Sequence, residues 1–127
     1  MNIPETILAG MRKTNDLFCT TVVGHRDVDA LDHVYTKDAR ILPPGAEMID
    51  NLAAIKQFWL QAISGLNVTG ASLTTVSAEQ AGDTVVEIGQ AELTLAGGQL
   101  VPIKYVVHWK VEDSAWKWHI DIWNMNQ

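Results

Sequence analysis

The last quarter of the chain carries the pattern that most constrains the fold. Two segments rich in Trp, Val and Ile, Gln99–Glu112 and Trp116–Asn124, flank the turn-forming residues Asp113-Ser114-Ala115. This pattern predicts a β-hairpin of two long antiparallel strands. Because strands of this length twist and curl, we expect the hairpin to belong to a curved sheet that wraps around a helix. The hairpin would then form one wall of a ligand pocket.

Two further strands are predicted just before this hairpin. Leu66–Glu79 and Thr84–Leu95 are rich in Val, Thr and Leu, and they are separated by the turn Ala81-Gly82-Asp83. Gly70 interrupts the alternation of the first segment and is expected to mark a β-bulge. The second half of the chain is therefore expected to be an antiparallel meander.

The first half has a mainly helical pattern. Apolar residues recur at helical spacing in three stretches, which predicts helices over Pro4–Val23, over Asp27–Tyr35 and from Leu52 to about Ile63. Two short strands, Ala39–Leu42 and Ala46–Ile49, are expected between the second and third helices. Helices followed by a long antiparallel meander indicate an α+β fold.

The bulk properties limit the classes of protein to which the chain can belong. Its 127 residues fit a single domain spanning residues 1–127. The apolar runs are too short for a membrane span and no signal peptide is visible, so no membrane partner and a cytoplasmic location are expected. The single Cys19 is expected to be a small buried hydrophobe. A net charge of −6 with scattered basic residues argues against nucleic acid as a partner.

Several short motifs along the chain carry a family resemblance. They are Tyr35–Arg40, Pro43-Pro44-Gly45, Ile55–Trp59, Tyr105–Lys110 and Trp116–Asn124. In this order and spacing the chain resembles the SnoaL-like group of the nuclear transport factor 2-like superfamily, close to the SgcJ/EcaC type. The association domain of calcium/calmodulin-dependent kinase II is a further relative.

The resemblance implies a cystatin-like, cone-shaped cup. Three N-terminal helices would pack on a strongly curved, mostly antiparallel sheet, with a cavity between the two layers and commonly a homodimer. Two departures are visible. Asn51 stands where the family usually has Gly, and the hairpin turn Asp113-Ser114-Ala115 lacks its usual Gly.

The length of that turn decides which side chains face the cavity, because side chains alternate along a strand. A two-residue Asp113-Ser114 turn would place Trp109 opposite Trp118. A three-residue turn would instead put Tyr105, Val107 and Trp109 on one face with His119, Asp121 and Trp123. In relatives, positions matching Val107 and Trp123 line the cavity, so we favour the three-residue turn.

The other face of the hairpin would then be too apolar for water. It would hold Val106, Trp118, Ile120 and Ile122. Such a face suits contact with a second copy of the chain, so we expect a homodimer through the outer face of the sheet.

Asp121 is the first candidate for chemistry. A carboxylate facing an aromatic cup loses hydration, which raises its pKa and suits it to acid–base work near neutral pH. His119, two residues earlier on the same strand face, could assist. The alternative is that both residues are structural or face solvent. The pair His119-x-Asp121 supplies only two ligands, so no metal site is expected.

The remaining candidates are residues that would line the cup. Aromatic rings offer apolar contact area with polar edges that can orient a ligand. The set comprises Tyr35, Trp59, Tyr105, Val107, Trp109 and Trp123, whose alternative role is plain core packing.

Two functions of different class follow from these expectations. The first is a small enzyme that needs no cofactor, an isomerase, cyclase or hydrolase acting on an apolar or polyketide-like substrate through Asp121. The second is a non-catalytic ligand-binding or oligomerisation domain. The chain has no nucleotide-binding glycine loop and no serine-nucleophile elbow. Ketosteroid isomerase activity is disfavoured, because Pro43 stands near the position of that family's base and the first helix has no Tyr.

Overall fold

The computed structural model describes residues 2–126. The elements in chain order are α1 (Glu5–Leu17), η1 (Phe18–Gly24), η2 (Val28–His33), β1 (Tyr35–Leu42), α2 (Leu52–Leu66), β2 (Val68–Ala81), β3 (Thr84–Leu95), β4 (Leu100–Glu112) and β5 (Ala115–Met125). η1 is a π-helix that continues α1, and η2 is a short 3-10 helix.

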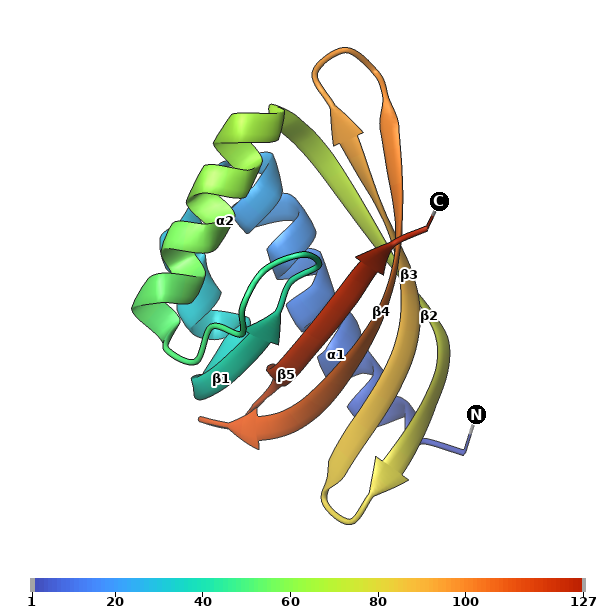
Figure 1. Cartoon of the computed structure of the whole chain (residues 1–127). Coiled ribbons are helices and arrows are strands. Elements are labelled where there is room, and N and C mark those ends of the chain that lie inside the picture. The colour runs from blue at the N-terminus through green and yellow to red at the C-terminus, as the bar shows by residue number, and fades with distance from the viewer. Residues whose placement is uncertain (1, 127) are drawn as a thin grey trace.

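The strands form one sheet in the order β1-β5-β4-β3-β2. β1 and β5 run parallel, and the other neighbours run antiparallel. Figure 1 shows that the long strands curve and that α1 and α2 lie on the same side of the sheet. This arrangement confirms the predicted α+β cup, in which the helices cover the concave face of a mostly antiparallel sheet.

The predicted helices are present, with two differences at their ends. The first helix changes from α to π geometry at Phe18, so that three of its residues, Phe18, Val22 and Val23, are buried together. Short π segments are uncommon and often occur beside functional sites. Tyr35 was predicted at the end of the second helix, but it begins β1, where the neighbouring carbonyl of Val34 accepts a 2.8 Å hydrogen bond from the Trp118 amide of β5.

The predicted strands are also found, with one exception. Ala46–Ile49 was expected as a strand but is reduced to one bridge between Ile41 and Ile49. The Pro43-Pro44-Gly45 sequence before it leaves too few residues to continue the pairing. The bulge predicted at Gly70 is confirmed by a shift of register between Val68 and Gly70.

The hairpin turn differs from the prediction. Glu112 pairs with Ala115, so the turn has two residues, and Asp113 and Ser114 both have positive φ (54° and 63°). These values are typical of a type I′ turn, whose backbone twist matches that of the two strands. The prediction of a three-residue turn is therefore wrong.

A second irregularity changes the consequence of that turn. Trp109 pairs with Trp118, whereas His108 pairs with Ile120, so His119 is an extra residue on β5. This β-bulge reverses the alternation of β5 beyond it. As a result Trp118, before the bulge, and Asp121, after it, both face the concave side of the sheet.

The turn generates a prediction about stability. Ser114 occupies the left-handed region, which costs a residue with a Cβ about 1 kcal/mol and costs glycine little. Ser114→Gly should therefore raise the free energy of unfolding by about 0.5–1 kcal/mol, measured by urea denaturation. Ser72→Gly, an exposed position within β2, is the control and should lower it. Equal losses in the two variants would contradict the assignment of the turn.

Candidate functional site

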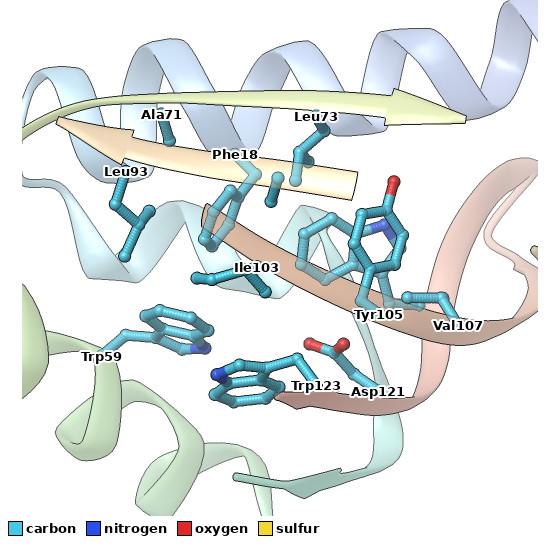
Figure 2. A pocket seen from close by; sticks show the side chains of 12 residues that line it. Phe18, Trp59, Ala71, Leu73, Leu93, Ile103, Tyr105, Val107, Asp121 and Trp123 are labelled. Carbon is cyan, nitrogen blue, oxygen red and sulfur yellow. The ribbon is translucent and has the colours of Figure 1, made fainter. Parts of the chain in front are cut away.

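The concave face of the sheet and the helices above it enclose a recess. The volume of the recess, including its open mouth, is about 450 Å³. The centre of a water molecule can reach only about 40 Å³ of this volume. The recess is therefore narrow and suits a compact group of a few heavy atoms. Its lining is formed by Phe18, Trp59, Ala71, Leu73, Ala91, Leu93, Ile103, Tyr105, Val107, Trp118, Asp121 and Trp123, and Figure 2 shows them around the space.

Aromatic rings make up most of the wall near α2. Trp59 of α2 and Trp123 of β5 are stacked, with centroids 5.2 Å apart and planes 20° from parallel. Phe18, at the start of the π-helix, meets Trp59 edge-on at 5.2 Å and Trp118 at 4.9 Å. Contacts of this kind stabilise the packing beyond simple area burial and fix the ring positions.

Among the described residues, Asp121 is the one carboxyl group in this lining. It is only 5% exposed, and its Oδ2 accepts a 2.6 Å hydrogen bond from the Tyr35 hydroxyl. The Trp59 indole N–H in turn donates to the Tyr35 oxygen at 3.1 Å. Burial raises the pKa of Asp121 to about 7; the Tyr35 hydrogen bond lowers it, while the negative charge of Glu87 raises it. Both protonation states of Asp121 are thus populated near neutral pH.

A second carboxylate, Glu87, lies beneath the same face and is fully buried. Three donors hold it: the Thr75 hydroxyl at 2.6 Å, the Tyr105 hydroxyl at 2.9 Å and the Trp109 indole N–H at 2.9 Å. Hydrogen bonds to the charged form compensate for the loss of hydration. The two acids share one row across the sheet, because Val107 of β4 pairs with both Glu87 and Asp121.

Tyr105 lies between the recess and Glu87 because Gly89 leaves room for it. A Cβ added to Gly89 would lie 2.2 Å from Cζ of the Tyr105 ring, so a side chain there would displace the ring. Burial and the charge of Glu87 raise the pKa of Tyr105, which keeps its hydroxyl protonated as a donor. Gly89 and Tyr105 are cross-strand partners, so glycine is needed here for close approach.

Most of the residues expected in the cup lie at the recess. Trp59, Tyr105, Val107, Asp121 and Trp123 line it. Tyr35 and Trp109, also expected there, are fully buried behind the lining, where Tyr35 binds Asp121 and Trp109 binds Glu87. These two residues therefore position acids instead of meeting a ligand.

The structure does not bring His119 to the recess. Its ring faces the outer side of the sheet, 5.9 Å from that of His108, and its Nδ1 lies 2.8 Å from the Thr36 hydroxyl. Partial burial and the nearby Lys110 charge lower its pKa. The expectation that His119 shares a face with Asp121 is wrong. His119 is the extra residue of the bulge, and the alternation of side chains along β5 reverses there.

The bulge also corrects the expectation for Trp118. It was placed on the outer face, but it is 4% exposed and lines the recess, with its indole N–H donating to Asn15 at 3.1 Å. Phe18 and Glu87 were not predicted as site residues. Glu87 alternates with Val85, Gly89 and Ala91 in β3, and an acid on such an apolar face was a signal that it is buried and bound.

Within residues 2–126, no group of three or more His, Cys, Asp or Glu side chains is placed to hold a metal ion. Of the helices in that range, none combines the length and the apolar character that a membrane crossing requires.

The raised pKa of Asp121 predicts a pH-dependent stability. Because folding raises this pKa from 3.8 to about 7, the folded state loses stability as the pH rises through that interval. Asp121→Asn keeps an acceptor for Tyr35 and cannot ionise. Relative to wild type, its free energy of unfolding should therefore rise between pH 4 and pH 8, by at most on the order of 3–4 kcal/mol. Urea denaturation across this range measures the difference.

The exposed carboxylate Asp38 supplies the control. Asp38→Asn should follow the wild-type dependence on pH. An Asp121→Asn profile parallel to wild type over the whole range would contradict the raised pKa.

Comparisons with known proteins agree with this architecture. A structure of a protein of unknown function from Mycobacterium tuberculosis has a TM-score of 0.82 at 14% identity, covering 94% of this chain and 72% of that one. A ketosteroid isomerase-like protein from Erwinia carotovora atroseptica gives 0.74 at 13% identity, with 100% and 99% covered. A nuclear transport factor 2-like protein from Cytophaga hutchinsonii gives 0.66 at 20% identity, with 99% and 100% covered.

At these identities the structural likeness shows the fold alone. No curated protein matches the sequence. The family model of the SnoaL-like domain, however, matches residues 17–119, which include most of the sheet and the recess. The chain belongs to the SnoaL-like family.

Proposed function

We propose that the recess binds a small apolar or aromatic ligand and that Asp121 exchanges a proton with it. The protein would then act, without a cofactor, as an isomerase, cyclase or hydrolase on an apolar or polyketide-like substrate. The observation that carries this proposal is a buried carboxyl group, with a pKa of about 7, in a recess otherwise lined by apolar and aromatic groups.

The hydrogen bonds around Asp121 support a role in proton transfer. Tyr35 binds Oδ2, and no hydrogen bond to Oδ1 is found among residues 2–126. Because no buried side-chain oxygen in that range is left unpaired, Oδ1 is accessible. A ligand in the recess could therefore meet Oδ1. A general acid or base is most effective when its pKa lies near the working pH, which is the case here. The surrounding rings would keep water away from the reacting atoms.

The wall of the recess supports an apolar ligand. The stacked indoles of Trp59 and Trp123 and the ring of Phe18 offer flat apolar surface. One structural relative is described as ketosteroid isomerase-like, which fits proton transfer on a ring. The chain has Pro43 near the position of that family's base, so any acid–base chemistry here would depend on Asp121.

Hydrogen exchange tests the catalytic proposal. Neutral cyclic enones incubated in D₂O with the protein should gain deuterium at the acidic carbon next to the carbonyl, followed by NMR. Asp121→Asn should slow the exchange about 10²–10⁴-fold, the usual contribution of a general acid or base, while ligand binding is kept. Asp38→Asn, on the neighbouring strand but exposed, should leave the exchange unchanged.

A direct titration separates this function from the alternative one. ¹³C NMR of the Asp121 carboxyl should show a midpoint near pH 7. If the Asp121 carboxyl instead titrates at the acidic pH usual for aspartate, and Asp121→Asn binds ligand as well as wild type does, the catalytic function is contradicted. This result would favour the second candidate, a non-catalytic ligand-binding or oligomerisation domain.

The outer face of the sheet supports the oligomerisation part of that candidate. The residues Val86, Ile88, Val106, Ile120 and Ile122, called the outer patch below, lie next to one another on β3, β4 and β5. Four of them keep 37–49% of their surface exposed. Contiguous apolar surface of this kind is typical of a protein interface. We propose that a second copy of the chain covers the outer patch and forms a homodimer.

A charge placed in the outer patch tests this dimer. Ile88→Arg should yield a monomer in analytical ultracentrifugation, because a buried unpaired charge at an interface costs several kcal/mol. Val111, 53% exposed and outside the patch, is the control, and Val111→Arg should leave the mass unchanged. A monomeric wild type, or a dimeric Ile88→Arg protein, would contradict the proposal.

A further inference from the structure

The charges and donors around the recess restrict the ligand more than its apolar character does. We propose that the ligand carries a compact organic ammonium group, which lies against Asp121 and the faces of the surrounding aromatic rings. This inference rests on the proposed binding role of the recess and not on catalysis.

The charges at the recess are all of one sign. Asp121 lines it and Glu87 lies behind Tyr105, whereas no Lys, Arg or His lines it among residues 2–126. An anionic ligand would have to leave water without meeting a positive group, and it would lie near two carboxylates. The desolvation cost of such a ligand would not be offset.

The hydrogen-bond donors at the recess are mostly used within the protein. The Trp59 indole N–H binds Tyr35, the Tyr105 hydroxyl binds Glu87, and the Trp118 indole N–H binds Asn15. A ligand that depends on accepting several charge-assisted hydrogen bonds, such as a carboxylate, would find few donors. A cation needs acceptors and π faces, which the recess provides.

The aromatic rings complete this environment. Phe18 contacts both Trp59 and Trp118, and Trp59 stacks on Trp123. Figure 2 shows the Asp121 carboxyl beside Trp123. A cation within about 6 Å of a ring centre is attracted by the negative face of the ring, most strongly for Trp. An alkylated ammonium has a large apolar surface as well as a charge, so both the rings and the acid would bind it.

The size of the recess favours a compact head group. The part of the recess that the centre of a water molecule can reach, about 40 Å³, is large enough for a compact group such as a methylated nitrogen. An apolar remainder of the ligand would lie toward the mouth, past the stacked Trp59 and Trp123 rings.

A pair of probes of equal shape tests the inference on the full chain. Choline carries a quaternary nitrogen, and 3,3-dimethylbutanol has carbon in its place. Binding would be followed by Trp fluorescence and by the indole N–H signals of Trp59 and Trp123. At pH 8, choline should bind at least about tenfold tighter than the alcohol, and Asp121→Asn should bring the two affinities within about twofold.

The pH dependence supplies a second readout that needs no variant. A cation favours the ionised form of Asp121, so choline should bind more weakly as the pH falls below about 7, whereas the alcohol should not. The groups facing Asp121 are Tyr35 from β1, Glu87 from β3 and Tyr105 from β4. The raised pKa of both tyrosines excludes their titration in this range.

The outcomes separate this inference from the proposed function. Equal affinities, or tighter binding of the alcohol, would overturn the ammonium preference while leaving an apolar binding cup in place. If neither probe moves the two indole signals at 50 mM, the ammonium preference is also overturned. The acid–base role of Asp121 is then judged separately by the deuterium exchange described above.

Discussion

The arrangement of the recess depends on one extra residue in β5. With His119 as a bulge, Trp118 and Asp121 face the same side of the sheet although they lie three positions apart. Without the bulge, either Trp118 or Asp121 would turn outward, since strict alternation cannot place both inside. The bulge therefore allows both Trp118, which packs against other aromatic rings, and the Asp121 carboxyl to line the recess. It also moves the imidazole of His119 to the outer surface.

The acids of the inner face connect the layers of the fold. Glu87 binds side chains of β2 and β4, and Asp121 is linked through Tyr35 of β1 to Trp59 of α2. Each acid is buried, so each must be compensated by its partners or give up its charge. Glu87 has three donors and Asp121 has one. With a single donor, Asp121 is only partly compensated, and its burial raises its pKa to about 7.

Much of the fold could be predicted from the pattern of apolar residues, because the strand and helix periods are strong over long segments. The Trp-rich hairpin and the bulge at Gly70 follow from such patterns, whereas the lining role of Tyr105, Val107 and Trp123 was inferred from the resemblance to relatives. The position of His119 could not be predicted. Neither the two-residue turn nor the three-residue turn describes the whole hairpin, since the true pairing changes register at His119. Phe18 was missed as a lining residue because its apolar helical spacing predicts burial but does not distinguish a ring that lines a recess from plain core.

The Tyr35 hydroxyl has a single hydrogen, which makes the two oxygens of the Asp121 carboxyl inequivalent. Trp59 donates to the Tyr35 oxygen, so the Tyr35 hydrogen is left to point at Oδ2 of Asp121. An acid proton on Oδ2 would oppose that hydrogen, whereas one on Oδ1 would not. The network therefore distinguishes two oxygens that are chemically equivalent in a free carboxyl group. A molecule bound in the recess would therefore exchange a proton with Oδ1 alone. The exchange would take place on one face of that molecule, so it would be stereospecific.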